Sequence, residues 1–333
     1  MRVVLAALAA TSMLAAPIAV AAQSSNSGQK SAQSTPAKSQ VKKRLSEQVL
    51  DSKRTAKKLM AQIMLDRAGY SPGVIDGYGG GNTTNAVEAY QRANGMKADG
   101  VVNSALLKKL RDKDSGKFMR VVQLKSKDVN ESYAKVPEGM EAMSKMKHVG
   151  YESISEMLAE RYHMDQDFLK ALNPDYDWAA AKAGDSIIVV NPGPAKLDKT
   201  VDRIIVDKPN NQVEAYAGDE LLATYPATIG SGDLPSPSGT MDVAAVAPEA
   251  NYTFNPETNN WGGDKALTIA AGPNNPVGGV WIDLSKPTYG IHGSPDPALI
   301  GKTQSHGCVR LTNWDARELA DAVKAGAKVE FKG

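Results

Sequence analysis

The spacing of apolar residues changes near residue 200, and this change constrains the fold more than any other feature of the chain. Before it, apolar residues recur at the three-to-four spacing of amphipathic helices. After it, short β-rich runs alternate with Gly, Pro and Asn, which predicts a mainly β domain. The 333 residues are more than one domain of about 150 residues needs, so we expect two or three domains.

The N-terminus combines a basic residue with an apolar run. Arg2 precedes the run, and the small residues Ala19, Ala21 and Ala22 near its end suit cleavage by signal peptidase near Gln23. Residues 1–22 therefore predict a secretory signal peptide, with an uncleaved membrane anchor as the alternative. We expect an exported protein, periplasmic or associated with the cell wall, with no transmembrane helix after cleavage.

Residues 23–46 are rich in Ser, Gln, Ala and Lys and contain no aromatic residue, which predicts a disordered linker. Six Lys or Arg and no acidic residue precede Glu47, which leaves 33 basic against 37 acidic residues, a net charge of about −4. A general nucleic-acid binder needs a basic face, so this balance argues against nucleic acid as a partner.

Residues 47–112 contain three short helical patterns separated by turn-rich stretches. The patterns cover residues 59–64, 86–90 and 106–110. Asp76-Gly77 and Asp99-Gly100 form turns, and Gln91 lies on the second pattern. The segment resembles the small all-α peptidoglycan-binding domain of many wall enzymes, and this resemblance implies a peptidoglycan partner.

Residues 113–147 are expected to form a linker before a small α+β module at 148–193. The module contains two helical patterns, the second of which ends at Asn173-Pro174. An apolar run at 186–190 predicts a strand. The order of elements resembles a divergent LysM-type module. Since the opening Gly-Asp-Thr-Leu of that family is replaced at 152–154, glycan binding and a structural spacer both stay open.

Residues 200–333 contain the β-rich runs and one helix near the end. The predicted strands are 204–206, 212–216, 221–229, 267–270, 280–284 and 329–331. We expect Asn313 to cap the helix and Gly326 to end it. Trp281 and Tyr289 are expected to pack in the core, with lining of the active-site cleft as the alternative. His148 and His163 show no partner in the sequence.

Cys308 is the only cysteine, so the chain can form neither an intramolecular disulfide nor a thiolate metal cluster. A small buried hydrophobe is the structural interpretation of such a residue. His292 and His306, however, lie within sixteen residues of it and could take its proton. Gly307 would let an acyl carbon approach and leave the backbone N–H groups of Gly307 and Cys308 to face an oxyanion.

This stretch resembles the signature of the L,D-transpeptidase (YkuD-type) family. The signature residues are His292-Gly293 and Ser305-His306-Gly307-Cys308-Val309-Arg310. The resemblance covers about 130 residues, and it implies a β-sandwich-like catalytic domain with a short C-terminal helix. It also implies an acyltransferase without a cofactor.

The resemblance assigns roles residue by residue. Cys308 is the nucleophile, His292 is the base, and the Gly293 carbonyl orients the imidazole. Ser305 and His306 shape the loop. Arg310 binds a substrate carboxylate or fixes the loop, and the sequence leaves both open. No further carboxylate or His stands at ligand spacing, and no Ser-x-x-Lys set is evident, which disfavours a metal hydrolase and penicillin-target chemistry.

The implied reaction joins the third residues of two peptidoglycan stem peptides through a cysteine thioester, and carbapenems would acylate the same thiol. Water as the acceptor would give a carboxypeptidase or a hydrolase that releases wall-attached protein. A protein amine would instead attach a lipoprotein or an outer-membrane protein to the wall. A wall-binding scaffold without activity is the remaining alternative, disfavoured by the intact set of Cys308, His292 and Arg310.

Overall fold

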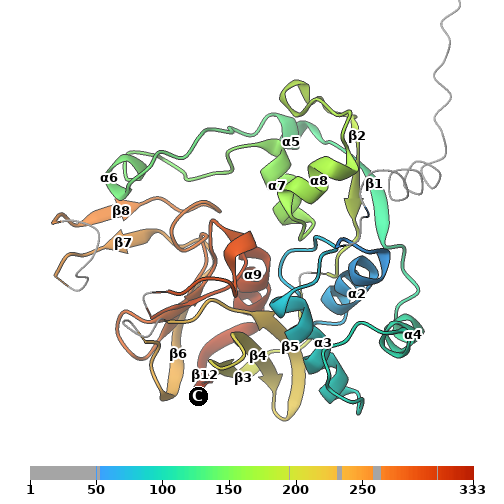
Figure 1. Cartoon of the computed structure of the whole chain (residues 1–333). Coiled ribbons are helices and arrows are strands. Elements are labelled where there is room, and N and C mark those ends of the chain that lie inside the picture. The colour runs from blue at the N-terminus through green and yellow to red at the C-terminus, as the bar shows by residue number, and fades with distance from the viewer. Residues whose placement is uncertain (1–49, 51–52, 195, 231–234, 258–263, 306) are drawn as a thin grey trace, which may run out of the picture. The chain divides into compact units, whose positions relative to one another are not determined.

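The computed structural model describes residues 50, 53–194, 196–230, 235–257, 264–305 and 307–333 (Figure 1). All described elements belong to one compact unit, residues 36–333. The expected signal peptide, the expected linker at 23–46 and the expected site residue His306 lie outside the described residues. Among the described helices, none has the length and apolar character to cross a membrane.

The first part is helical. It consists of α2 (Ala56–Arg67), α3 (Gly81–Ala93) and α4 (Ser104–Lys113), which match the three predicted patterns. Helix α2 begins after Thr55 and α4 after Asn103, and each capping side chain accepts a hydrogen bond from a first-turn amide. Leu65, Val87 and Leu106, one from each helix, are fully buried in a shared core.

A glutamine secures each Asp-Gly turn of this helical part. Gln62 donates to the aspartate of Asp76-Gly77 (2.9 Å) and accepts from the glycine amide (2.7 Å). Gln91 makes the same two bonds with Asp99-Gly100, at 2.9 and 3.0 Å. Both glycines have positive φ (78° and 66°), a conformation that favours glycine. The recurring Gln and Asp-Gly pairs therefore hold the turns between the helices.

The second part is a two-stranded sheet covered by two helices. Strand β1 (Met119–Gln123) pairs antiparallel with β2 (Ser186–Val190). Helices α7 (Ile154–Arg161) and α8 (Gln166–Leu172) bury Leu158 and Leu169 in the same core as the strands. The short elements α5 (Ser126–Val129), α6 (Met140–Met143) and η2 (Trp178–Ala180) complete it.

One boundary differs from the prediction. Strand β1 lies inside 113–147, which we expected to be a linker, and it supplies half of the small sheet. The strand is only five residues long, and its burial does not alternate strictly because Val121 and Val122 are both partly buried. Such a short run gives no clear period-two signal in the sequence.

The C-terminal domain is built on one eight-stranded sheet with the order β11-β10-β9-β6-β12-β3-β4-β5. The strands are β3 (Val201–Asp207), β4 (Gln212–Ala217), β5 (Glu220–Pro226), β6 (Gly239–Ala247), β9 (Trp281–Leu284), β10 (Gly290–His292), β11 (Val309–Arg310) and β12 (Val323–Lys332). The pairs β12/β3 and β10/β11 are parallel, and the other pairs are antiparallel. A separate hairpin consists of β7 (Tyr252–Phe254) and β8 (Leu267–Ile269), and η3 (Pro297–Leu299) precedes β11.

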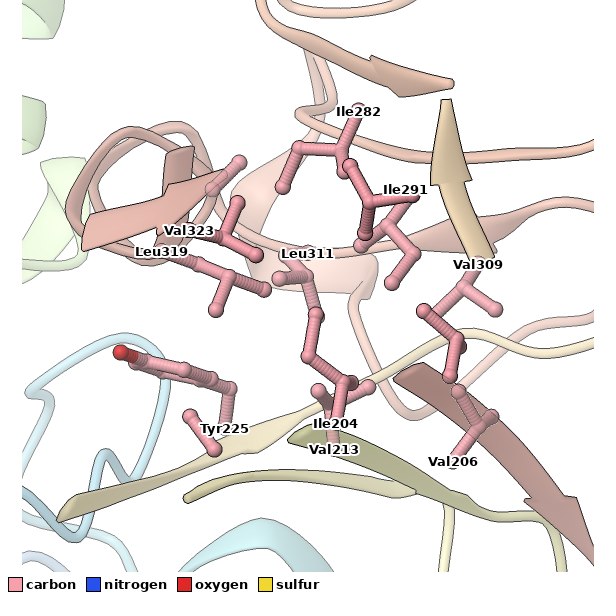
Figure 2. Packing of buried hydrophobic residues seen from close by; sticks show 14 of the residues in the cluster. Ile204, Val206, Val213, Tyr225, Ile282, Ile291, Val309, Leu311, Leu319 and Val323 are labelled. Atoms are coloured by element: carbon pink, nitrogen blue, oxygen red, sulfur yellow. The ribbon is translucent and has the colours of Figure 1, made fainter. Parts of the chain in front are cut away.

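The sandwich-like arrangement that we expected is thus a single mixed sheet rather than two stacked sheets. Register shifts in β6 and β12 interrupt the regular pairing, and such bulges bend a sheet and increase its twist. The sheet thereby encloses its own core together with α9 (Asn313–Ala322). Figure 2 shows Leu319 of α9 among strand residues that include Ile204 and Ile291.

The ends of α9 differ from the prediction. Thr312, not Asn313, caps the helix, and its hydroxyl accepts from the Asp315 N–H at 3.2 Å. Threonine and asparagine are both favoured N-cap residues, so the sequence alone does not separate two adjacent candidates. The helix gives way directly to β12 at Val323, so Gly326 lies within the strand and does not end the helix.

Backbone hydrogen bonds join the C-terminal domain to both preceding parts. Ser71 N–H donates to Thr224 O (2.9 Å), and Thr224 N–H donates to Gly69 O (2.8 Å). From the second part, Val149 N–H donates to Ala271 O (3.1 Å). The three parts are therefore packed against one another within the described unit.

Candidate active site

The register of β10 and β11 brings the predicted chemical groups to one face. Ile291 lies opposite Val309, and both side chains are fully buried in the core. His292 lies opposite Arg310. Because successive strand residues point to opposite faces, His292 and Arg310 point away from the core. Cys308 directly precedes β11, and the charge of Arg310 acts on both Cys308 and His292, so the three groups lie near one another.

The imidazole of His292 is buried and oriented. Its Nδ1 lies 2.7 Å from the Gly293 carbonyl oxygen, which can only accept, so Nδ1 carries the proton and Nε2 keeps its lone pair. The Trp281 ring stacks on it with centroids 5.4 Å apart and planes 22° apart. Burial lowers the pKa of His292 to about 4, and the charge of Arg310 acts in the same direction. The ring is therefore neutral at neutral pH.

The Cys308 side chain is half-buried, and its Sγ donates to the Thr288 carbonyl at 3.6 Å. Burial raises the pKa of this thiol, while the Gly290 backbone and the Arg310 charge oppose that rise. The site thus holds a protonated thiol and a neutral imidazole. A base must remove the thiol proton before or during attack on a substrate.

Serine hydroxyls hold the loop that carries Cys308. Ser305 Oγ donates to the Cys308 carbonyl at 2.5 Å and accepts from the Gly307 N–H at 3.2 Å. Ser236 Oγ donates to the Gly307 carbonyl at 2.6 Å. Gly307 has a φ of +111°, and a Cβ there would lie 2.9 Å from the Tyr289 ring, so glycine is required. Contrary to our expectation, its N–H is occupied by Ser305 and does not face an oxyanion in this conformation.

Arg310 is half-buried, and its Nε has no hydrogen-bond partner within the described part of the chain. Its backbone pairs with Thr228, so the strand position is fixed while this donor remains unused. The charges of Cys308 and Arg310 also act on Tyr252 of the β7–β8 hairpin. Burial and Cys308 raise the pKa of the Tyr252 hydroxyl, and Arg310 opposes the rise.

No group of three or more His, Cys, Asp or Glu side chains is placed to hold a metal ion in the ranges that the structure covers. The groups gathered around Cys308 are instead a thiol, an imidazole, a guanidinium and backbone amides. They suit nucleophilic acyl transfer, in which the base and the nucleophile come from neighbouring strands.

Comparisons with known proteins agree with this chemistry. Residues 201–331 match the L,D-transpeptidase catalytic domain (YkuD), and residues 59–110 match the "Putative peptidoglycan binding domain". The "Putative L,D-transpeptidase YkuD" of Bacillus licheniformis is 31% identical over 176 residues, which are 53% of this chain and 92% of that protein. The chain belongs to the L,D-transpeptidase family.

A second relative of the transpeptidase, the protein of the same name in Bacillus subtilis, is 30% identical and aligns over 52% of this chain and 89% of its own length. A solved "L,D-transpeptidase from Mycobacterium smegmatis" is 19% identical with a TM-score of 0.33, covering 46% of this chain and 65% of that chain. Family membership confirms the predicted enzyme class. The protein is a transpeptidase, an acyltransferase of the family that crosslinks peptidoglycan.

The sequence did not identify several residues around the site of the transpeptidase. The sequence favours core packing for Trp281 over a place in the cleft, whereas the indole stacks on His292, and alternation with the buried Ile282 could have placed it on the other face. Ser236 and Thr288 reach the cysteine loop from distant segments, and no local pattern reveals such contacts.

Two further histidines were predicted without partners. His148 is exposed, as expected for a surface residue. His163 is buried, with Nδ1 2.9 Å from Asp66 Oδ1, and it stacks on Trp314 with centroids 5.1 Å apart. The two residues of the ion pair are 97 positions apart, so only the packed structure brings them together.

Proposed function

We propose that the transpeptidase joins the third residues of two peptidoglycan stem peptides through a thioester on Cys308. One observation carries this proposal: the neutral, oriented imidazole of His292 pairs in register with Arg310, whose charge also acts on Cys308, the only cysteine of the chain. The family model supports acyl transfer at this site. The roles of the individual residues are those that the resemblance implies, and the orientation of His292 supports them.

In the first step, Cys308 Sγ attacks the carbonyl of the L-centre of diaminopimelate in a tetrapeptide stem. His292 Nε2 takes the thiol proton as the S–C bond forms. It returns that proton to the amide nitrogen as the C–N bond breaks and D-Ala leaves. An amine of a second stem then attacks the thioester, and its proton returns to Sγ through His292. One amide breaks and one forms, so the exchange needs no ATP.

The resting protonation state supports this sequence of proton transfers. With the thiol pKa raised and the imidazole pKa lowered, charge separation before substrate binding is unfavourable. We infer that Cys308 loses its proton to His292 only as the substrate carbonyl is attacked. This differs from a preformed thiolate–imidazolium pair, in which the imidazole pKa would lie above its usual value.

Two groups are available for the charges of the substrate. The Gly307 N–H is bound to Ser305, so we propose that the Cys308 N–H donates a hydrogen bond to the oxyanion of the substrate. Any further donor would have to approach when the substrate binds. Arg310 is half-buried beside Cys308, and a guanidinium forms strong charge-assisted bonds with carboxylates, which supports binding of a stem-peptide carboxylate. In the second interpretation, the Arg310 guanidinium fixes the active-site loop by bidentate hydrogen bonds.

The preceding parts support action on the wall. The match of residues 59–110 to a peptidoglycan-binding family supports our proposal that this region holds the enzyme on its polymer and raises the effective substrate concentration. We propose that 119–190 is a LysM-like module, on the strength of its strand, two helices and pairing strand. Export by the sequence at 1–22 would place the enzyme in the periplasm or wall.

The test is to incubate purified disaccharide-tetrapeptide with the protein and with Cys308→Ala, and to read muropeptides and intact protein by mass spectrometry. A dimer lacking one D-Ala, formed only when Cys308 is present, is the expected result. A tripeptide without dimer would move the proposal to hydrolysis. An acyl-enzyme that is trapped without either product would point to a protein amine as acceptor. No product and no adduct, with carbapenem also leaving the mass unchanged, would overturn the proposed function.

A further inference from the structure

A buried glutamate of the second part contacts the C-terminal domain next to the active site. Glu160 lies on α7 and is 6% exposed. Its two carboxyl oxygens accept from Asn313 Nδ2 at 3.2 and 3.0 Å, although the two residues are 153 positions apart. Asn313 is the first residue of α9, and because Thr312 caps that helix, the asparagine side chain is available for this contact.

The other end of the Asn313 amide reaches the peptide that orients His292. Asn313 Oδ1 accepts from the Ser294 N–H at 2.9 Å. The carbonyl of the same peptide unit, on Gly293, accepts from His292 Nδ1 at 2.7 Å. Since a peptide unit is planar and rigid, fixing its N–H also fixes the direction of its carbonyl. Asn313 therefore determines where the acceptor of the imidazole proton points.

Two glycines make this close arrangement sterically feasible. A Cβ at Gly293 would lie 2.3 Å from Asn313 Oδ1, and a Cβ at Gly278 would lie 1.9 Å from it. Gly278 also has a φ of +60°, which favours glycine. Asn313 Oδ1 thus packs closely against backbone, and a rotation that exchanged Nδ2 and Oδ1 would place the NH2 group there instead. An acceptor at Glu160 and the Pro273 carbonyl, 3.1 Å from Nδ2, oppose that rotation.

We propose that Glu160 is a positioning residue for His292, acting through Asn313 and the Gly293–Ser294 peptide. The inference rests on the proposed role of His292 as the base. Hydrogen bonds in a chain polarise one another, so an acceptor on Asn313 Nδ2 strengthens the bond to Ser294 and in turn the bond to the imidazole. Docking of the second part on the C-terminal domain is then required for fast acylation of Cys308.

The link requires an acceptor at Glu160 rather than a full charge. Burial raises the pKa of Glu160 to about 8, and Glu156 adds to this rise, while the hydrogen bonds from Asn313 and Tyr151 oppose it. The carboxyl is therefore largely protonated near pH 7. Glutamine keeps the acceptor oxygen and the size of the protonated form, whereas alanine removes the acceptor.

The chain offers a matched control on the same helix. Glu156, one turn before Glu160, accepts from Asn274 Nδ2 at 2.6 Å, so it also joins α7 to the C-terminal domain. The Asn274 side chain donates in addition only to Gly150 O in the described structure. Glu156→Ala thus removes an interdomain contact of similar size without removing a hydrogen bond made directly to Asn313.

The experiment measures the rate of Cys308 acylation by a carbapenem, using intact mass, in the full chain. We expect Glu160→Ala and Asn313→Ala each to slow acylation about tenfold, the factor that corresponds to losing one buried hydrogen bond. Glu160→Gln should stay within about twofold of the wild type. The Glu160→Ala/Asn313→Ala double variant should be no slower than the slower single variant, because both changes break one pathway.

Several outcomes would overturn the inference. These are wild-type rates for Glu160→Ala, an equal loss for Glu156→Ala, failure of Glu160→Gln to retain the rate, or additive losses in the double variant. If Glu160→Ala does not fold, as judged by its melting temperature, Glu160→Leu, which fills the same space without an acceptor, takes its place in each comparison. Failure of the proposed function is distinguishable, because the wild-type protein would then not be acylated at all.

Discussion

The indole of Trp281 lies against the imidazole of His292, with ring centroids 5.4 Å apart and planes 22° apart. The two residues are opposite each other in the antiparallel pair of β9 and β10. A Cβ at the adjacent Gly290 would lie 2.4 Å from the indole, so this glycine makes room for the stack. Trp281 therefore covers one face of the imidazole and contributes to its burial.

Trp281→Ala should raise the pKa of His292 from about 4 toward its usual value near 6.5, because water would reach the exposed ring. Trp281→Phe keeps an aromatic cover and should leave the pKa low. The acid limb of the pH profile, where the acylation rate falls at low pH, reports this pKa, since protonated imidazole cannot act as a base. We expect the limb to move to higher pH only in the alanine variant, and an unmoved limb would show that Trp281 does not shield His292.

The protonation state of Cys308 can be measured by alkylation. Iodoacetamide reacts with the thiolate, so its rate should rise with pH and reach its midpoint above the value of about 8.5 of free cysteine. Arg310→Gln should move the midpoint higher still, because the positive charge that favours the thiolate is lost. Arg310→Lys keeps that charge and serves as the control. A rate that is already at its plateau at pH 7 would contradict a neutral thiol.

A buried acidic cluster makes the folded state sensitive to alkaline pH. Burial raises the pKa of Asp315 to about 8 and that of Glu318 to about 7. Between the usual carboxyl pKa near 4 and these values, the folded state binds more protons than the unfolded state, so stability falls as pH rises. Asp66 raises the pKa of His163, so the stability from its charged form is also lost as pH rises. The lowered pKa of His292 acts oppositely, but only between about 4 and 6.5.

The melting temperature should therefore fall between pH 6.5 and pH 8.5 in a thermal scan. Asp315→Asn should make this fall shallower, because asparagine cannot ionise and still accepts the hydrogen bond that Ser71 Oγ donates to Asp315 at 3.0 Å. Asp321→Asn on the same helix changes an exposed carboxylate and serves as the control. A melting temperature that rises over this interval would contradict the assignment.

The residues that could be predicted from sequence are those whose signal is local. The Cys308 motif is contiguous, and the helices of the first part follow from spacing within single elements. Contacts such as Glu160 with Asn313, or His163 with Asp66, join segments about 100 or more positions apart. Nothing in the periodicity of either segment encodes its partner, so these contacts required the packed structure. The cap of α9 shows the same limit at short range, since Thr312 and Asn313 are both good capping residues and only packing decides between them.

Thr288 combines strain with a contact to the nucleophile. Its φ is +72°, a left-handed conformation that is unfavourable for a β-branched residue, and its carbonyl accepts from Cys308 Sγ. Asparagine adopts this conformation more readily and costs less entropy on folding than glycine. Thr288→Asn should therefore increase the free energy of unfolding by about 1 kcal/mol.

The same substitution keeps the backbone geometry, so the rate of Cys308 acylation should stay within about twofold of the wild-type rate. Thr288→Val retains β-branching and should give no gain in stability, which makes it the matched control. Urea denaturation of the three proteins provides the comparison. An equal gain in both variants would mean that loss of the threonine hydroxyl, rather than relief of the left-handed strain, is responsible. Loss of acylation in Thr288→Asn at unchanged stability would instead show that the threonine side chain itself acts on the thiol.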